Sequence, residues 1–572
     1  MSDINAYKRD KEKWEQEKLI PAGQKLHMEN PPRMYTPADL DGFDFKKDVG
    51  FPGEFPFVAG RHTIPLLSAF WGRGKTLGAG KAMKTAFGYS GCGTGSDLRD
   101  FYETEKGRGL SARGPNIAFD LPTQIGLDSD DERAEGEVGK VGVAVDTLKD
   151  FETIYENFIG DRGLDKISSN WTINGTANII LAMYIALAEK RGIPQSSLRG
   201  TPQNDILKEF IARGTQTFPI EHSMRMTRDT ITYCTEHMPK MNTISISGFH
   251  MREAGATRVQ AIAFTFANAM AYIQEAIDAG LDIDAFIGRT SFLNFGGGME
   301  VFKEAAARRA ARVVWAKIMR DKFKSQNPKH WIYKETGAAL AGFWTATKQR
   351  PLNNWIRVAI GAAFSAMIGD APVLSPPFDE PLGLGHSTEA GQFAGDAARI
   401  IIEECKLGDV QDPLAGSYYF EHLTKKYTDE ISQTLEKIDS LGGTIKLVKD
   451  GWMKNEIVRS AVAFGKKMAT GEEIQVGVNK YTEDDEIEII PKLTPMYASI
   501  DRDSAEKRQL QNLNKIMEER DGNKVRSCLE KIENAAKDEK MNLIPLFVDA
   551  VKEYATIGEI CNSLKNVFGE AL

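Results

Sequence analysis

The stretch TISISGFHMREAG, residues 243–255, places a hydroxyl side chain at every second position until it reaches a glycine. A period of two residues is typical of a β-strand, because successive side chains of an extended chain point to opposite faces. Thr243 and Ser247 therefore share one strand face, and isoleucines occupy the other. The pattern predicts a strand that leads into His250, with the histidine at its carboxyl end.

The same order of a short strand and a longer helix recurs along the middle of the chain. Helices are predicted where apolar residues recur every three to four positions, over residues 177–192, 259–280 and 299–323. The expected strands cover residues 116–121, 168–174, 200–204, 242–249, 287–294, 331–336 and 372–376. This alternation predicts an α/β fold, a (β/α)8 TIM barrel.

Composition divides the chain into three expected parts. Residues 1–84 begin with a charged helical pattern and continue with segments rich in proline and glycine, which is typical of an arm that packs on another surface. Residues 85–428 carry the strand–helix repeat of the barrel. Residues 429–572 are more charged and helical, and we expect them to form a C-terminal helical extension.

Two of the expected strands have an unusual polar face. In SNWTING (169–175) and in TISISG (243–248), small polar side chains alternate with apolar ones. An ordinary barrel interior is filled by valine, isoleucine and leucine. Polar residues on the inner face would indicate an axial channel, whereas polar residues facing the helices would leave an ordinary apolar interior. The pattern alone does not decide between the two.

Composition excludes several classes of function. The 572 residues include 72 basic and 80 acidic side chains, a net charge of −8 that gives no electrostatic basis for nucleic-acid binding. The five cysteines form no CxxC pair, which argues against a zinc site or a disulfide framework and suits a reducing cytoplasm. The charged N-terminus is unlike a secretion signal, and no apolar run of about 18 residues suggests a membrane span.

Polar residues are expected together where the strands end, since barrel enzymes build their sites at the carboxyl ends of their strands. This rim would hold Asp120, Asn174, Gln203, Ser291 and His250, with Arg213 on the following helix. A lone histidine is more often structural, and a solvated arginine is an equal alternative for Arg213. No pair of histidines has metal-ligand spacing, so no metal site is expected. The segment GRGKTLGAG (72–80) lacks the first glycine of a phosphate loop.

Five longer motifs carry a resemblance to a known family. They are AFDLPTQIGLDSD, GEVGKVGVAVD, TPQNDILKEF, SISGFHMREAGAT and DPLAGSYYFEHLT. The chain resembles the large, catalytic subunit of adenosylcobalamin-dependent acyl-CoA mutases, the methylmalonyl-CoA mutase family. The resemblance implies a barrel threaded by the pantetheine arm of coenzyme A. It also implies a small cobalamin-binding subunit as partner, with the cobalt ligated by that separate subunit, because the DxHxxG signature of the cobalamin domain is missing.

The resemblance implies a role for each matching residue. His250 would lie over the thioester carbonyl, where a hydrogen-bond donor stabilises charge that develops on oxygen, and Tyr89 would help to displace the deoxyadenosyl group. The residues implied to bind the acyl-CoA are Thr201, Gln203, Arg213, Arg289 and Ser291, with Arg213 on the free carboxylate. Those implied to lie around the cofactor are Phe119, Val141 and Ala212 at the corrin and Glu253 and Glu380 at the ribose.

Departures from the family pattern bear on the substrate. Phe87, Phe249 and Leu293 replace an arginine, a tyrosine and a phenylalanine, and residues 392–396 read QFAGD where the family has RIARN. These changes predict a larger and more apolar acyl pocket. We therefore expect a carboxylated, succinyl- or methylmalonyl-like acyl-CoA, with an alkyl-substituted acyl group as one form. The alternatives are a branched or hydroxylated monocarboxylic acyl-CoA and a noncatalytic assembly subunit.

Overall fold

The computed structural model describes most of the chain. It covers residues 4–63, 91–104, 107–108, 111, 113–293, 295–336, 345–369, 388–407, 409–482, 501 and 504–571. Four features named above therefore lie outside the described residues, namely Tyr89, Glu380, the segment 72–80 and the strand expected at 372–376.

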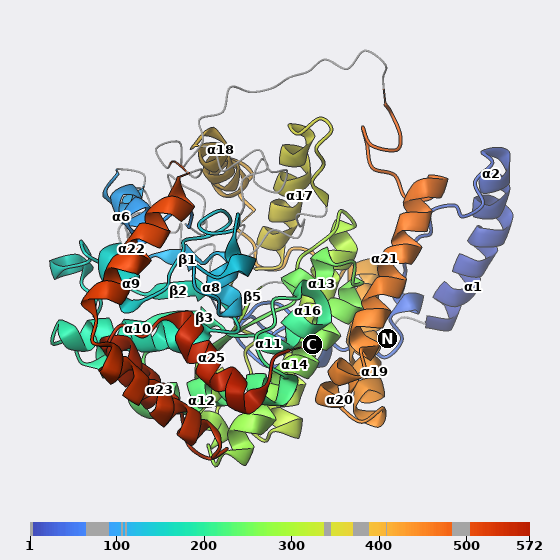
Figure 1. Ribbon diagram of the computed structural model, residues 1–572. Coiled ribbons are helices and arrows are strands. Elements are labelled where there is room, and N and C mark those ends of the chain that lie inside the picture. Colours follow the sequence, from blue (N-terminus) through green and yellow to red (C-terminus); the bar gives the residue numbers. More distant parts are fainter. Residues whose placement is uncertain are drawn as a thin grey trace.

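Six short parallel strands run through the centre of the molecule in chain order (Figure 1). They are β1 (Asn116–Ala118), β2 (Ser169–Thr172), β3 (Gly200–Gln203), β4 (Ile244–Ser247), β5 (Thr290–Leu293) and β6 (Glu335–Thr336). They form the sheets β1-β2-β3 and β4-β5-β6, and a bridge between Gly200 and Met241 connects the two. The alternating α/β arrangement is confirmed, whereas the described strands do not close into a barrel.

Helices connect and surround these strands. Those between β1 and β6 are α8 (Leu121–Ile125), η3 (Glu132–Ala134), α9 (Leu148–Ile154), η4 (Gly160–Arg162), α10 (Ala177–Lys190), η5 (Gln195–Ser197), α11 (Ile206–Lys208), η6 (Glu209–Arg213), α12 (Ile220–His237), α13 (Phe249–Glu253), α14 (Arg258–Asp278), α15 (Ile283–Phe286), η7 (Ile287–Arg289), α16 (Val301–Lys317), η8 (Ile318–Lys322) and η9 (Pro328–His330). Those before and after are α1 (Ile4–Trp14), η1 (Glu15–Leu19), α2 (Ile20–Lys25), α3 (Phe45–Asp48), α6 (Gly95–Glu103), α17 (Asn353–Met367), α18 (Thr388–Arg399), η12 (Ile400–Glu404), α19 (Tyr418–Ser440), α20 (Thr444–Lys449), α21 (Trp452–Thr470), α22 (Ala505–Glu519), α23 (Gly522–Ala536), α24 (Ile544–Lys552) and α25 (Ile557–Phe568).

The strands are shorter than the sequence pattern predicts, because turns and helices begin earlier. Asp120 ends β1 by accepting a hydrogen bond from the Thr123 amide at 3.0 Å, which caps α8. Residues 287–289, expected in a strand, form the turn η7 instead. The segment 249–253 is the helix α13, so His250 lies on a helix and not on the strand that precedes it.

The polar strand residues face away from the apolar core. Trp171 and Ile246 are almost fully buried in the two main hydrophobic clusters, against the helices. On the opposite face Asn170 pairs in register with Asn116 and Thr201, and all three remain partly exposed. Side chains of a strand alternate between faces, so the polar set is on the inner face of the strands. This placement agrees with an axial channel, which stays a prediction because the described strands do not close into a barrel.

The helices after residue 429 are part of the same hydrophobic cores. The cluster around β1–β3 includes residues of α23, α24 and α25, and the cluster around β4–β6 includes residues of α19, α20 and α21. In α10, twelve of the fourteen residues are buried, because α24 covers the side turned away from the strands. Helix α19 spans the expected limit between residues 428 and 429, and the division into three parts stays a prediction.

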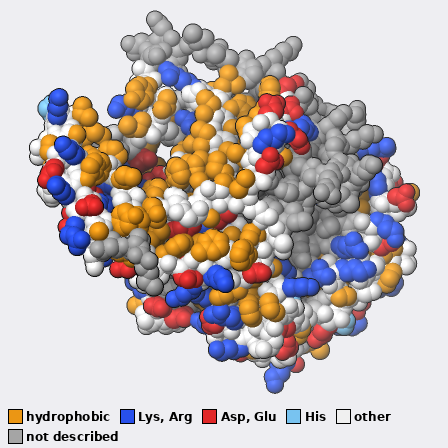
Figure 2. Space-filling model, turned by 180° about the vertical axis from the view of Figure 1, so that it is seen from behind, with side chains coloured by type: hydrophobic (Ala, Val, Ile, Leu, Met, Phe, Trp, Pro, Cys, Tyr) orange, Lys and Arg blue, Asp and Glu red, His pale blue; other side chains and the backbone are white. Residues whose placement is uncertain are grey.

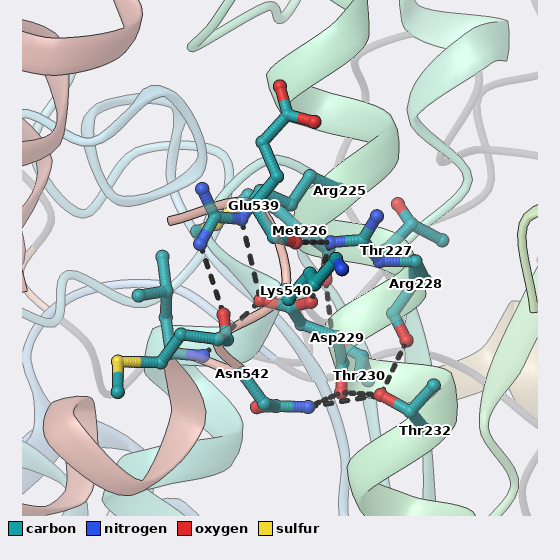
Figure 3. Close-up of polar contacts among 12 residues, drawn as sticks. Arg225, Met226, Thr227, Arg228, Asp229, Thr230, Thr232, Glu539, Lys540 and Asn542 are labelled. Carbon is teal, nitrogen blue, oxygen red and sulfur yellow. Dashed lines mark hydrogen bonds and ion pairs between the residues drawn. The ribbon is translucent and has the colours of Figure 1, made fainter. Parts of the chain in front are cut away.

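Polar contacts also attach the C-terminal helices to α12. Figure 3 shows Arg225 turned toward the backbone of the segment that follows α23. Its Nη1 donates to the Ala536 carbonyl at 2.5 Å, and its Nη2 donates to the carbonyls of Asp538 and Met541 at 2.5 and 3.0 Å. Asn542 Nδ2 donates to the carbonyl of Asp229 at 2.8 Å. Buried backbone acceptors of this turn therefore find partners on α12.

The N-terminal helices lie at the edge of the molecule (Figure 1). Helix α1 has no buried residue, and Lys11 attaches it to Asp39 at 2.6 Å. Apolar side chains remain exposed along this arm, including Leu26 at 67% and Met34 at 62%. Exposed hydrophobic side chains also gather on the face shown in Figure 2. Among the described residues no helix is long and apolar enough to cross a membrane.

Candidate active site

His250 lies at the carboxyl end of β4, in the short helix α13. Its Nδ1 is 3.0 Å from Ser247 Oγ, and its Nε2 contacts no other polar group among the described residues. Burial and the positive charges of Lys208 and Arg213 lower the pKa of His250 well below its ordinary value, so the ring is neutral at physiological pH. When Ser247 donates to Nδ1, Nε2 carries the proton and can donate it.

Gln203 ends β3 and is almost fully buried. Asn174 holds it through two contacts: the Asn174 amide donates to the Gln203 carbonyl at 2.6 Å, and Asn174 Nδ2 donates to Gln203 Oε1 at 3.5 Å. The side-chain oxygen of Gln203 is thus occupied, whereas its side-chain nitrogen has no partner among the described residues. It is a second hydrogen-bond donor without an acceptor.

Arg213 ends a π-helical turn, η6, which continues directly from α11. Its Nη1 donates to Gln124 Oε1 at 2.6 Å and lies 3.5 Å from Glu209 Oε1. The remaining nitrogens, Nε and Nη2, contact no polar group in the part of the chain that the structure describes, and the side chain is 25% exposed. Short π-helical turns often occur at functional sites, and this one leaves a guanidinium accessible for an anion.

Three buried charged residues next to this site were not predicted from the sequence, and we call them the Lys208 cluster (Asp205, Lys208 and Glu209). Lys208 and Glu209 form an ion pair in which both side chains are 0% exposed. Asp205 accepts the Ser247 amide at 2.8 Å and the Tyr272 hydroxyl at 2.7 Å. Burial raises the pKa of Asp205 to about 6, although Lys208 acts in the opposite direction. The motif QNDILKE reads as a solvated helix turn, so the pattern gave no signal of burial.

Three other predicted residues lie farther back along the strands. Thr201 is partly exposed on β3, and its Oγ1 accepts a hydrogen bond from Asn242 at 2.8 Å. Ser291 is the second residue of β5 and donates to the Ile244 carbonyl at 3.1 Å. Ser291 is in register with Ser245, two residues before the end of β4, so the structure does not place it at the carboxyl end of the strands with His250. Arg289 is exposed just before β5, at the end opposite to His250.

The predicted cofactor residues differ in their accessibility. Val141 is 61% exposed, and Ala212 in η6 is partly exposed. Phe119 is fully buried, and its ring stacks on that of Phe151 with centroids 6.2 Å apart. Glu253 is partly buried at the end of α13, three residues after His250. Only Val141 and Ala212 of these four present apolar atoms that a ligand could cover directly.

Two of the residues that depart from the family pattern border this site. The rings of Phe249 and His250 meet edge to face, with centroids 5.4 Å apart. Leu293 ends β5 in register with Ser247 and is partly exposed. Phe87 lies outside the described residues, and nothing is described for the side chain of Gln392.

The described site therefore consists mainly of hydrogen-bond donors. Gln203 and Arg213 come from the strand–helix unit of β3 and His250 from the next unit, that of β4. Contacts through Asn174 and the Lys208 cluster connect Gln203 with Arg213. Helix α13, which carries His250, packs against η6. Donors without protein acceptors suit a ligand that brings several oxygen acceptors, such as a thioester carbonyl and a carboxylate.

Known proteins similar to this chain establish its class. The chain is 37% identical over 544 residues to the 2-hydroxyisobutanoyl-CoA mutase large subunit of Aquincola tertiaricarbonis, covering 94% of this chain and 90% of that protein. It is 37% identical over 541 residues to the methylmalonyl-CoA mutase of Escherichia coli (strain K12), covering 94% and 71%. The fold, the donor-rich site and these relatives define an isomerase, an acyl-CoA mutase.

The family model described as methylmalonyl-CoA mutase matches residues 26–570. The chain belongs to the methylmalonyl-CoA mutase family. The mitochondrial methylmalonyl-CoA mutase of Homo sapiens, a further relative, is 37% identical over 532 residues, covering 93% of this chain and 66% of that protein. Membership implies the use of adenosylcobalamin.

Proposed function

We propose that the chain is the catalytic subunit of an adenosylcobalamin-dependent mutase whose acyl-CoA substrate carries a free carboxylate, as methylmalonyl- and succinyl-CoA and their alkyl-substituted forms do. The main support for this substrate class is that the guanidinium of Arg213 has free hydrogen-bond donors within the described part of the chain. Its Nε and Nη2 have no acceptor among the described residues, and the side chain is 25% exposed at the site. A planar guanidinium binds a carboxylate through two parallel hydrogen bonds.

His250 and Gln203 orient the thioester in this proposal. Both donate hydrogen bonds to the carbonyl oxygen, on which charge develops as the carbonyl carbon moves to the neighbouring position. His250 acts as a neutral donor, because burial and nearby cations keep its pKa low. It therefore stabilises the oxygen without transferring a proton to it.

The rest of the coenzyme A ester extends along the polar inner face of the strands. Thr201 and Ser291 lie on that face, and Arg289 stands at its far end, where a cation would meet a phosphate of the ester. The partial exposure of Asn116, Asn170 and Thr201 supports this path. Closure of the strands into a (β/α)8 barrel would complete the channel.

The cofactor would cover the carboxyl ends of the strands. The exposed apolar atoms of Val141 and Ala212 fit a flat apolar ring system. Phe119 would support that surface from the core, with Glu253 and Glu380 at the ribose, and Tyr89 would help to displace the deoxyadenosyl group. When bound, adenosylcobalamin supplies the organic radical that takes a hydrogen atom from the substrate. The chain excludes water, which protects the reactive species.

A separate small cobalamin-binding subunit would ligate the cobalt. This part of the proposal is supported by the similarity to a protein named as a large subunit, of which the chain covers 90%. The purified chain alone should then neither retain adenosylcobalamin in stoichiometric amount nor turn over any acyl-CoA. Tight cofactor binding by the isolated chain, measured by equilibrium dialysis, would contradict a separate cobalamin-binding subunit.

A second candidate substrate is a branched or hydroxylated monocarboxylic acyl-CoA. The observation in its favour is Glu209, whose Oε1 lies 3.5 Å from Arg213 and offers the guanidinium a protein anion. Glu209, however, already pairs with Lys208 and accepts hydrogen bonds from Thr215. A noncatalytic assembly subunit is a weaker alternative, because such a protein has no need of His250, Gln203 and Arg213 together.

Turnover by the chain assembled with a cobalamin-binding subunit tests the substrate class. Methylmalonyl-CoA, an alkylsuccinyl-CoA and 2-hydroxyisobutyryl-CoA are compared in the parent and in Arg213→Gln. We expect a carboxylated ester to be the best substrate of the parent, and we expect Arg213→Gln to lose turnover of that ester. If the hydroxyacyl ester is best and both proteins handle it equally, the carboxylate proposal is wrong.

A further inference from the structure

We propose that Lys208 is a positioning residue of the mutase site, which holds Gln203 through Asn174 on one side and Arg213 through Glu209 on the other. The inference rests on the proposed function, because that function gives Gln203 and Arg213 their roles. It adds a residue that does not touch the substrate but fixes the side chains that do.

The first connection runs from Lys208 to Gln203. Lys208 Nζ donates to Asn174 Oδ1 at 3.1 Å, and the Lys208 side chain is 0% exposed. Asn174 in turn contacts both the backbone carbonyl and the side-chain oxygen of Gln203. With the Asn174 oxygen held by an ammonium group, its Nδ2 is the end that faces Gln203. The Gln203 side chain then presents its own nitrogen away from this contact.

The backbone of Asn174 is consistent with a fixed functional position. Its φ of +76° is in the left-handed region, which costs free energy for a residue with a Cβ and which asparagine tolerates better than most. Such a conformation persists only where surrounding contacts determine it. Here the contacts are those with Gln203 and Lys208.

The second connection runs from Lys208 to Arg213. Lys208 Nζ forms an ion pair with Glu209, whose Oε1 is 3.5 Å from Arg213 Nη1. Glu209 is also held by Thr215, whose amide donates to its Oε2 at 3.2 Å. Burial raises the pKa of Glu209, but Lys208 and Arg213 outweigh this and lower it, so the carboxylate stays charged. The guanidinium is thus held at one edge, and its other nitrogens remain available.

Lys208 also acts on His250 by its charge. The charged groups around the ring are Lys208 on α11 and Arg213 on η6, with the carboxylates of Asp205 and Glu209 next to them, and the Ser247 hydroxyl contacts Nδ1. A cation close to the imidazole disfavours the imidazolium form. If Lys208 were only a structural ion-pair partner, its removal together with Glu209 would leave the site side chains unchanged, since buried pairs can often be replaced by apolar groups.

The test uses Lys208→Met, which keeps the length of the side chain and removes its charge. The His250 ring is observed by NMR in chain labelled with 13C-histidine, with its signal identified by its loss in His250→Gln. We expect the pKa of His250 to rise in Lys208→Met, because a cation is gone and Glu209 is left unpaired nearby. With the assembled enzyme, turnover of the best carboxylated ester should fall by about 10- to 100-fold, the cost of misplaced site groups.

The matched control is the double variant Lys208→Met/Glu209→Gln, which removes both charges and leaves no unpaired carboxylate. It should fold with the circular dichroism of the parent and still show reduced turnover, because Asn174 and Arg213 have lost their support. An unchanged His250 pKa in folded Lys208→Met, or parental turnover in the double variant, would overturn the proposal. The NMR titration needs neither substrate nor cofactor, so its result does not depend on the substrate class.

Discussion

Two arginines of this protein, Arg309 and Arg213, differ in burial and in the number of acids that pair with them. In the Arg309 cluster (Arg309, Asp412 and Glu421), the guanidinium of α16 is 0% exposed. It meets Glu421 at 3.0 and 3.1 Å, Asp412 at 3.0 Å and the Thr424 hydroxyl at 3.0 Å. At the site, Arg213 has one hydrogen bond, to a neutral amide, and a carboxylate at 3.5 Å that already serves Lys208.

Arg309 stabilises the fold, whereas Arg213 is available to bind a ligand. The acids around Arg309 come from the loop before α19 and from α19 itself, so the cluster fastens α19 to α16. Arg213 has polar contacts only with Gln124 and Glu209 among the described residues, and it keeps unpaired donors at a partly exposed position. Because these donors are accessible and have no acceptor among the described residues, we infer that the carboxylate of the substrate binds them.

The largest expected effect comes from breaking the paired cluster. Arg309→Leu leaves Asp412 and Glu421 buried without their cation, which should lower the free energy of unfolding by about 3–5 kcal/mol. Arg213→Leu is the matched variant. It should lower the free energy of unfolding by about 1 kcal/mol or less, since the Arg213 side chain is partly exposed. Urea unfolding followed by circular dichroism measures both. Equal losses would erase the distinction between the two clusters.

The next effect concerns catalysis without loss of stability. His250→Ala removes one donor to the developing oxygen charge, so turnover by the assembled enzyme should fall by about 10²- to 10³-fold. Binding of the CoA ester should change little. The control is His237→Ala, on the surface of α12, which should turn over as the parent does. Parental turnover in His250→Ala would assign the histidine a structural role.

The two regions should also respond differently to pH. Burial raises the pKa of Asp412 to about 6, although the nearby Arg309 and Arg312 act in the opposite direction. Asp412 has a pKa near 3.8 in the unfolded chain. Between about pH 4 and pH 6 its carboxyl group is therefore protonated in the folded state and ionised in the unfolded state. This contribution to stability is fully present below about pH 4 and is lost as the pH rises through about 6, and it amounts to roughly 3 kcal/mol.

Asp412→Asn should remove that part of the pH dependence of unfolding, measured between pH 4 and pH 7. His250, by contrast, has a lowered pKa and stays neutral, so its protonation should not reduce turnover between pH 8 and pH 6. A loss of turnover with a midpoint near pH 6.5 that disappears in His250→Gln would show a titrating histidine instead.

The sequence predicted the strand–helix order, with Gln203 at a strand end and Arg213 on the following helix, because strand period and helix period are local properties. It did not predict that His250 lies on the helix α13. It did not predict that Lys208 and Glu209 are buried, since their burial depends on the π-helical turn and on packing from α13. It did not predict that Ser291 lies two residues before the end of β5, because the register with β4 depends on tertiary pairing. The partner of Arg213, Gln124, is 89 residues away and is set by tertiary structure alone.

The most direct test of the account measures whether Arg213 recognises a carboxylate. Methylmalonyl-CoA and isobutyryl-CoA differ only by a carboxylate in place of a methyl group, so their dissociation constants form a cycle with the parent and Arg213→Gln. Calorimetry on the assembled enzyme should show that the parent prefers methylmalonyl-CoA by about 10- to 100-fold, the worth of a charge-assisted hydrogen bond, and that Arg213→Gln loses this preference. An equal preference in both proteins would contradict the assignment of Arg213 to the substrate.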